Sequence, residues 1–199
     1  MTGVAVRSVT FLTAALLLGA STGAGAQAAG AATAPEVFSA TAQAKTASSA
    51  VSGALVMRVS RYTPDFDRKT VEEALRLGGY PRFLTALRNA PEVGQLTLAD
   101  GPPYVIRYAR DKAVGAGREI VLVTDRPVFF VGSARTDAKP RAGYEVAVIQ
   151  IQVDGAGRGK GTMAAAARVR PDGTGGVLLD DYADALIEVT NVTRSPGSQ

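Results

Sequence analysis

Apolar and polar residues alternate with a period of two over most of the chain after Glu36. In residues 149–153, for example, isoleucine and valine alternate with glutamine. Such a pattern is typical of strands that bury one face and leave the other in water. We therefore expect strands near residues 36–45, 55–60, 95–98, 104–109, 118–124, 128–131, 149–153, 176–179 and 186–193.

One stretch between these strands has a helical pattern instead. Thr70 and Glu73 have the spacing of a capping box, in which each side chain accepts a hydrogen bond from the backbone amide of the other residue. We expect a helix to start at Thr70 and to end at Gly78–Gly79. A second short helix should start at Pro81, with its apolar residues on one side, at Phe83, Leu84 and Leu87.

Short connections indicate how the strands pair. Glycine and proline occur in the segments 100–103, 154–155 and 171–173, and such short links favour antiparallel neighbours because a parallel partner needs a crossover of about a dozen residues. The prediction is an α+β fold with a mainly antiparallel sheet of about 8–10 strands, barrel-like or strongly twisted and open, and one helical excursion near residues 66–89. The helix pair would plug the end of a barrel or lie across an open sheet.

The two ends of the chain differ from this domain. Residues 1–26 combine a single charge, Arg7, with an apolar stretch and with small residues before Gln27, which is typical of a signal peptide. We expect a flexible leader at 27–35, a single β-rich domain at 36–194 and a disordered tail at 195–199. No later stretch of the sequence is long and apolar enough to cross a membrane. The sequence thus predicts an exported protein, periplasmic or extracellular.

Composition excludes several kinds of chemistry. The 199 residues include no histidine and no cysteine, which removes imidazole bases, thiol nucleophiles, disulfides and thiolate metal sites. A metal could be held only by oxygen ligands, as calcium or magnesium are. The formal net charge of +4 comes from scattered basic residues, without the patch that a nucleic-acid binder needs. We expect no nucleic-acid partner and no cofactor.

A glycine-rich loop follows the strand expected at 149–153. Residues 154–162 resemble a phosphate-binding loop, but an aspartate stands at the first glycine position and Gly161 separates Lys160 from Thr162. We interpret the loop as a hairpin turn in which glycines supply positive φ. The alternative is a small anion site that combines backbone amides with Arg158 and Lys160.

The segment after this loop can form a strand or a helix. Its four consecutive alanines favour a helix, but Pro171 leaves few helical turns and the segment also alternates, at Met163, Ala165, Ala167 and Val169. We favour a strand. Its small side chains would leave space beside the sheet, which the helix pair fills or which stays open as a ligand cavity.

A small ligand, if one is bound, is expected in the interior beside this alanine strand. Tyr104 and Tyr108 share one face of the strand at 104–109 by simple alternation, where they pack as core or form a wall for the ligand. Arg107 and Arg110 would then lie near the rim of that cavity.

An acidic cluster, Asp180, Asp181 and Asp184, is found where two strands should connect. The simplest interpretation is a solvated turn. One alternative is a calcium site, although the spacing of a calcium loop is absent. The other is a pair of carboxylates for glycoside hydrolysis, which needs one carboxyl with a raised pKa and a second at a defined distance.

None of these motifs assembles a nucleophile with its base, so the sequence favours a protein without catalytic activity. The excess of arginine over lysine, 17 to 5, with abundant alanine and glycine, indicates GC-rich coding of a bacterial type. We expect an exported β-rich domain that binds a small amphipathic molecule or associates with a protein partner. The alternative is an exported carboxylate-dependent hydrolase that acts on glycans.

Overall fold

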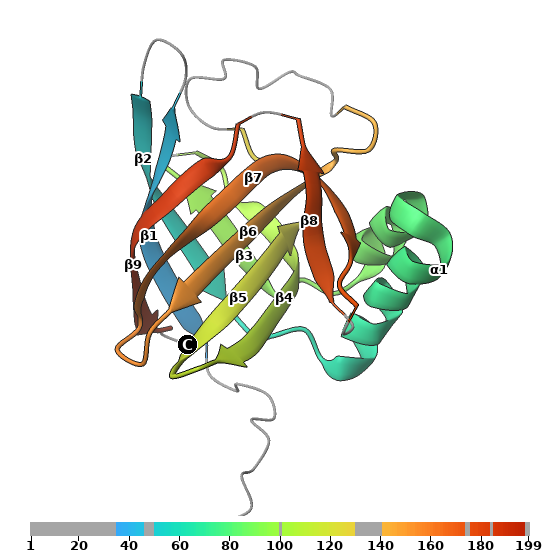
Figure 1. The fold of residues 1–199 in the computed structure, drawn as a ribbon, viewed down its shortest axis with the longest axis horizontal. Helices are drawn as coiled ribbons and strands as arrows, with labels where there is room; N and C mark the ends of the chain where they lie inside the picture. Colours follow the sequence, from blue (N-terminus) through green and yellow to red (C-terminus); the bar gives the residue numbers. More distant parts are fainter. Residues whose placement is uncertain are drawn as a thin grey trace, which may run out of the picture. The chain divides into compact units, whose positions relative to one another are not determined.

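The computed structural model describes residues 35–45, 50–99, 101–129, 141–173, 176–183 and 185–197. The predicted signal peptide and nearly all of the predicted leader lie outside these residues. The described chain runs in the order β1 (Glu36–Lys45), β2 (Ala50–Val59), α1 (Asp65–Asn89), β3 (Gly94–Leu98), β4 (Tyr104–Val114), β5 (Gly117–Thr124), β6 (Val146–Val153), β7 (Arg158–Pro171), β8 (Val177–Tyr182) and β9 (Ile187–Pro196) (Figure 1).

Eight of these strands close into an antiparallel barrel. Their order is β6-β5-β4-β3-β2-β1-β9-β7, and β6 pairs with β7 to complete the ring. The long strand β7 also pairs with β9 through Arg158–Met163 and with β8 through Ala167–Pro171, so β8 extends the sheet outside the ring. The predicted α+β class with a mainly antiparallel sheet is confirmed, and the sheet takes the barrel form.

Two glycines allow β7 to follow the tight curve of the barrel. A Cβ at Gly159 would lie 1.8 Å from the carbonyl oxygen of Gln152, and a Cβ at Gly161 would lie 2.0 Å from that of Gln150. No side chain fits in so close an approach of two backbones. These two glycines of the predicted loop therefore belong to β7, where they allow its backbone to pack closely against β6.

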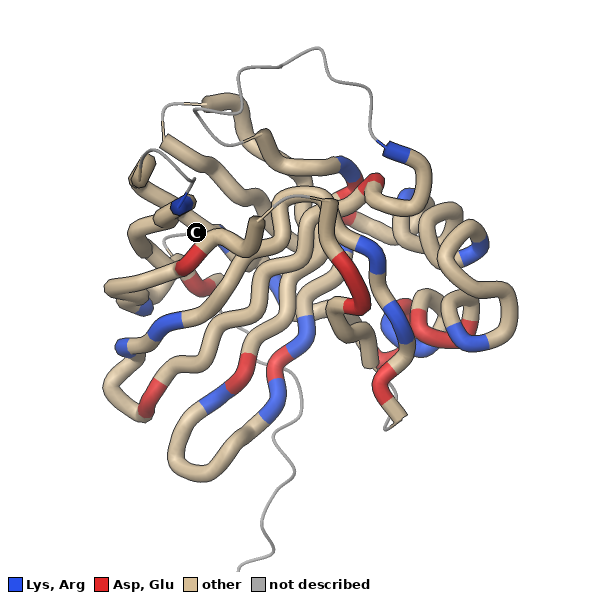
Figure 2. Tube along the Cα trace, turned by 45° about the horizontal axis from the view of Figure 1, so that its top comes forward, with Lys and Arg blue, Asp and Glu red and all other residues tan. Residues whose placement is uncertain are grey.

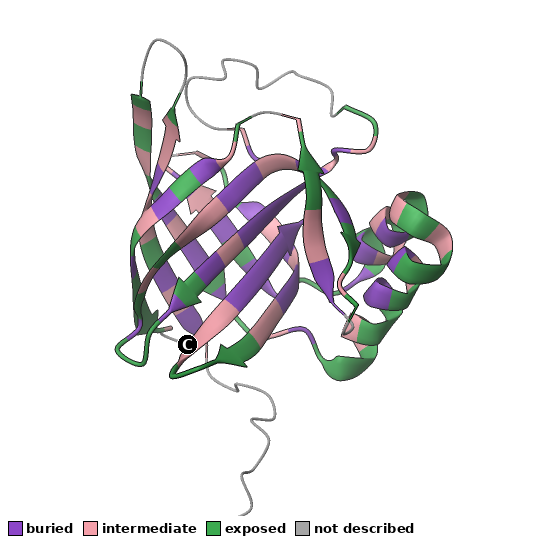
Figure 3. Ribbon diagram, in the orientation of Figure 1, coloured by how far each residue is buried: buried purple, intermediate pink, exposed green. Residues whose placement is uncertain are grey.

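Side chains fill the interior of the barrel. A ring of eight strands is just wide enough for the inward-facing side chains to meet, and Figure 3 shows buried residues repeating along the strands. The largest inward-facing side chains have no solvent exposure: Phe38, Leu55, Met57, Leu96, Ile106, Ile120, Leu122, Ile149 and Ile151. The interior is a packed hydrophobic core.

A second apolar cluster lies on the outside of the barrel, beneath α1. The helix contributes Val71, Leu75, Phe83 and Leu87, and the strands contribute outward-facing residues including Val121, Val123 and Val148. Ala164 and Ala167 of β7 belong to the same cluster, so the predicted alanine strand is observed and the helix fills the space beside it. α1 does not plug the end of the barrel but lies across its outside, a position that we expected only for an open sheet (Figure 1).

The helical region begins earlier than we expected. α1 starts at Asp65, and Thr70 lies within it, where its hydroxyl donates to the carbonyl oxygen of Phe66 at 3.0 Å. The capping-box prediction at Thr70 was therefore wrong. Asp65 and Asp67 place negative charge in the first turn, which favours a helix start after Pro64. The predicted break is present, because Gly79 has φ 65° and ψ −167° and divides α1 into two halves.

Two other boundaries differ from the prediction. Val128 and Phe129 are not part of a strand, although the backbone amide of Val128 donates to the carbonyl oxygen of Ala165 at 2.9 Å; residues 130 and 131 lie outside the described ranges. β9 continues through Ser195 and Pro196 because β1 offers an edge for pairing there. Within the described ranges, no helix is long and apolar enough to span a membrane.

Candidate functional site

The two tyrosines that we expected on one face lie on opposite faces of β4. A β-bulge shifts the register between Ile106 and Tyr108, and an extra residue reverses the side that the following residues face. Tyr104 therefore packs in the barrel interior, whereas Tyr108 packs in the cluster beneath α1. The Tyr108 hydroxyl donates a hydrogen bond to Oε1 of Glu72 on α1 at 2.8 Å. The pair does not line a common cavity.

The two arginines that we expected near the rim of a ligand cavity instead contact residues of neighbouring elements. Arg107 donates to the carbonyl oxygen of Ala90 at 2.9 Å and pairs with Asp125 at 3.3 Å. Arg110 pairs with Asp172, next to the turn between β7 and β8, at 3.2 Å. Both arginines thus hold neighbouring elements on the outside of the barrel.

The acidic cluster is divided by the strand that carries it. Asp180 and Asp181 are successive residues of β8, at a point where the register with β7 shifts, and their side chains have different partners. Asp180 lies 3.9 Å from Nε of Arg170, while Asp181 accepts a hydrogen bond of 2.5 Å from the hydroxyl of Tyr144. Asp184 lies outside the described residues.

The environment of Asp181 favours its charged form. The hydrogen bond from the Tyr144 hydroxyl, followed by that from the backbone amide of Tyr182, lowers the pKa of Asp181 below its ordinary value. A general acid for glycoside hydrolysis needs the opposite shift. Among the residues that the structure describes, no group of three acidic side chains could hold a metal ion.

A polar cluster that the sequence pattern did not predict closes one end of the barrel. Glu36 on β1 is only 4% exposed, and Tyr62, Arg118 and Arg194 all contact its carboxylate. The Tyr62 hydroxyl donates at 2.5 Å, Nη2 of Arg118 donates at 3.0 and 3.3 Å, and Nε of Arg194 lies at 2.6 Å. Arg118 also pairs with Asp111 at 2.7 Å.

These contacts keep Glu36 ionised although it is buried. Burial alone raises the pKa of Glu36, but the hydrogen bonds from Tyr62 and Arg118 and the charges of Arg118 and Arg194 lower it further than burial raises it. The same arrangement has the reverse effect on the phenol, because burial and the neighbouring carboxylate raise the pKa of Tyr62. A carboxylate held in this form is a structural anion and a poor proton donor.

Beside this cluster, the ends of the β4–β5 and β6–β7 hairpins form an open groove of about 500 Å³. Its cationic lining residues are Arg118, Arg158 and Lys160, and Val114 adds exposed apolar surface. The structure therefore brings together the two residues of the predicted anion loop, Arg158 and Lys160, next to Arg118 of β5, which is already paired with Glu36 and Asp111.

The loop at 154–158 is the hairpin turn that we predicted. Oδ1 of Asp154 accepts hydrogen bonds from the backbone amides of Ala156 and Arg158, each at 2.9 Å, and Gly157 has φ 75°. The one carboxylate in the groove is thus engaged by the backbone of the turn. The side chains of Arg158 and Lys160 form no ion pair or hydrogen bond with any described residue.

The arrangement can hold a negative charge beside an apolar surface. Figure 2 shows basic positions, with acidic ones beside them, near the tips of the hairpins at this end of the barrel. Searches for related proteins add nothing to this geometry, since no family model, no curated protein and no solved structure matches the chain.

Proposed function

We propose that this protein is a non-catalytic binding module that takes a small amphipathic anion into the groove at Arg158 and Lys160. The observation that carries the proposal is that these two cations line one groove and have no anionic partner among the described residues. Two neighbouring positive charges without a partner attract a carboxylate, sulfate or phosphate group.

The apolar part of the groove supports an amphipathic ligand. Val114 lines the groove at the end of β4 and is 46% exposed. Burying a short alkyl chain against this side chain gains roughly 25 cal/mol per Å² of apolar surface removed from water. The charged head of such a molecule would lie toward Arg158 and Lys160.

The packed interior supports a site on the outside. Large side chains with no exposure occupy the centre of the barrel, so a ligand there would have to displace them, at the cost that overfilling a packed core carries. The N-terminal sequence pattern further suggests that the module works after export, in the periplasm or outside the cell.

Titration calorimetry with decanoate, kept below its critical micelle concentration, tests the proposal. We expect the Arg158→Gln, Lys160→Gln double variant to bind decanoate about 5- to 30-fold more weakly, since each partly exposed charge contact contributes about 0.5–1 kcal/mol. A matched double variant, Arg58→Gln with Lys69→Gln, removes two exposed cations that are not in the groove and should bind as the wild type does.

A second probe distinguishes the effect of the ligand's charge from that of its hydrophobic chain. Decyltrimethylammonium has a similar chain and the opposite charge, and it should not bind detectably. Equal binding of the two amphiphiles, or an equal loss of affinity in both double variants, would show that the two groove cations do not recognise an anion.

A further inference from the structure

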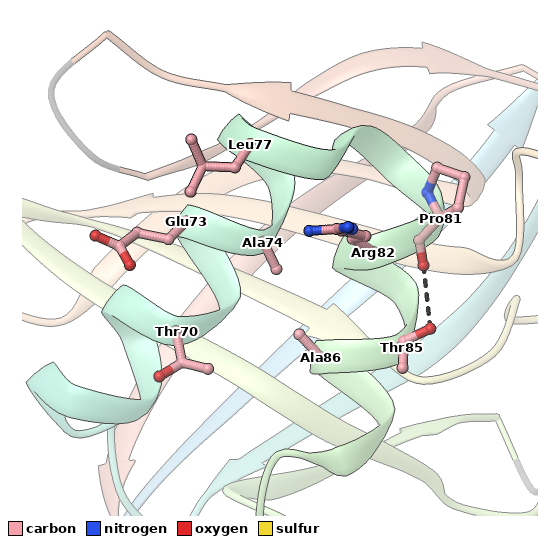
Figure 4. A pocket seen from close by; sticks show the side chains of 8 residues that line it. All are labelled: Thr70, Glu73, Ala74, Leu77, Pro81, Arg82, Thr85 and Ala86. Atoms are coloured by element: carbon pink, nitrogen blue, oxygen red, sulfur yellow. Dashed lines mark hydrogen bonds between the residues drawn. The ribbon is translucent and has the colours of Figure 1, made fainter.

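The two halves of α1 enclose a second groove, on the side of the helix that faces away from the barrel core. It has a volume of about 640 Å³. Glu73, Ala74 and Leu77 line it from the first half, and Arg82 and Ala86 line it from the second (Figure 4). The kink at Gly79 creates this groove, because it turns the second half of the helix back beside the first.

The first half of α1 carries the two most exposed large apolar side chains of the described chain, and Leu77 also lines the groove. Phe66 is 80% exposed and Leu77 is 66% exposed. Phe66, Thr70, Glu73 and Leu77 follow one another at steps of three or four residues, so they form a single row along the first half of α1. Exposed apolar side chains gathered on one face indicate a surface that another molecule covers.

The groove also contains one charge of each sign, and the two do not pair. Glu73 and Arg82 both line it, yet neither forms an ion pair with any described residue. In Figure 4 the Glu73 side chain points away from the second half of the helix, while the Arg82 side chain extends toward the first half. The stem of Arg82 lies against Gly78, where a Cβ would come within 1.9 Å of its Cδ.

We infer that this face binds a second copy of the same chain about a two-fold axis, with Glu73 of each copy facing Arg82 of the other. A two-fold interface uses the same patch on both copies, so the patch must be complementary to itself. The row of the first half together with Arg82 of the second half meets that requirement, because it has apolar ends and one charge of each sign, and the two-fold operation places opposite charges together twice. Phe66 and Leu77 would then lose their exposure to water.

Charge reversal provides the test, with molar mass measured by sedimentation velocity. The chain is purified from cells that express it with its own N-terminal segment. We expect the wild type to have the mass of a dimer, and Glu73→Arg and Arg82→Glu each to be monomeric, because each single change places like charges together at both contacts. An equimolar mixture of the two variants should form a dimer again, and so should the double variant.

A control variant tests whether replacing an exposed apolar residue outside this face also changes the oligomeric state. Val114→Asp changes an exposed valine at the other groove and should remain dimeric, whereas Leu77→Asp should be monomeric with an unchanged circular dichroism spectrum. A monomeric wild type, single charge variants that stay dimeric, or a mixture that fails to associate would overturn the inference. Decanoate binding is measured separately, so the fate of the ligand proposal does not decide this one.

Discussion

Arg118 on β5 donates hydrogen bonds to both carboxylate oxygens of Glu36 on β1, at 3.0 and 3.3 Å. In the ring of eight strands, β1 and β5 are separated by three strands in either direction. The two residues thus meet across the end of the barrel rather than between neighbouring strands. Their pairing covers the hydrophobic core at the end where it would otherwise contact water.

Replacing Glu36 by glutamine should destabilise the protein by about 2–4 kcal/mol at pH 7, because it leaves the two arginines without the buried carboxylate that neutralises them. Urea unfolding followed by circular dichroism measures the change. Glu188→Gln is the matched control, since it removes a carboxylate from an exposed pair with Lys45 and should cost under about 0.5 kcal/mol. Equal costs for the two changes would mean that burial adds nothing to the Glu36 contacts.

The contribution of Glu36 should depend on pH in one direction. The folded protein holds the pKa of Glu36 below its ordinary value of 4.5, so the unfolded chain binds a proton more readily than the folded one. The stability that the carboxylate contributes is complete above that value and is lost as the pH falls through the folded pKa. The difference in unfolding free energy between wild type and Glu36→Gln should be constant from neutral pH down to about pH 5 and shrink below it. A difference that grows on acidification would contradict this sign.

Tyr108→Phe should loosen the contact between α1 and the barrel. The change removes a hydroxyl that donates to the buried Glu72 carboxylate, at an expected cost of about 1–2 kcal/mol. Amide exchange should accelerate in α1 more than in the β1–β2 hairpin. Tyr182→Phe serves as the control, because no described residue hydrogen-bonds the Tyr182 hydroxyl; a similar effect of both changes would assign the cost to something other than the Glu72 contact.

Gly79→Ala tests whether the kink in α1 depends on a conformation that only glycine adopts easily. A side chain at φ 65° and ψ −167° should cost about 1–3 kcal/mol, although the nearest atom to an added Cβ is 4.0 Å away. Gly115→Ala is a graded comparison, because Gly115 has φ 57° in an open turn and should cost about 1 kcal/mol. Thermal unfolding ranks the two variants, and a smaller loss at Gly79 than at Gly115 would be inconsistent with strain at the kink.

Most strands of the barrel can be predicted from alternation alone. The segment 36–45 coincides with β1, and the expected boundaries of β3 and β5 differ from the observed ones by a single residue. The period of two is a local property, and a half-buried strand imposes it wherever the strand pairs. Closure of the ring depends instead on β7 pairing with both β6 and β9, which is a long-range relationship that alternation does not encode.

Two features of the structure, the bulge in β4 and the start of α1, do not follow from the local sequence pattern. The bulge before Tyr108 reverses the faces of β4, and no residue in that segment signals an inserted position, so the aromatic face could not be placed correctly. The helix start was missed because Thr70 and Glu73 match a capping box by spacing, while the first turn at Asp65 carries only the weaker signal of two acidic residues after a proline.

The charged end of the barrel could have been found from the sequence. Glu36 lies two residues before the inward-facing Phe38, and Arg118 lies two residues before the inward-facing Ile120. Residues two apart on a strand face the same side. Alternation therefore places both charges on the inward face, which is an unusual position that calls for a partner. Which charges meet could not be predicted, because that requires the order of strands around the ring.

The most direct test of the account is a nuclear magnetic resonance titration of the isotope-labelled protein with decanoate. A filled barrel with its ligand on the outside predicts shifts in the amides of Gly159 and Lys160 and in the methyl groups of Val114, while the methyl groups of Leu55, Met57 and Ile149 stay unchanged. Shifts in those interior methyl groups, or no shift in the groove at saturating decanoate, would contradict it.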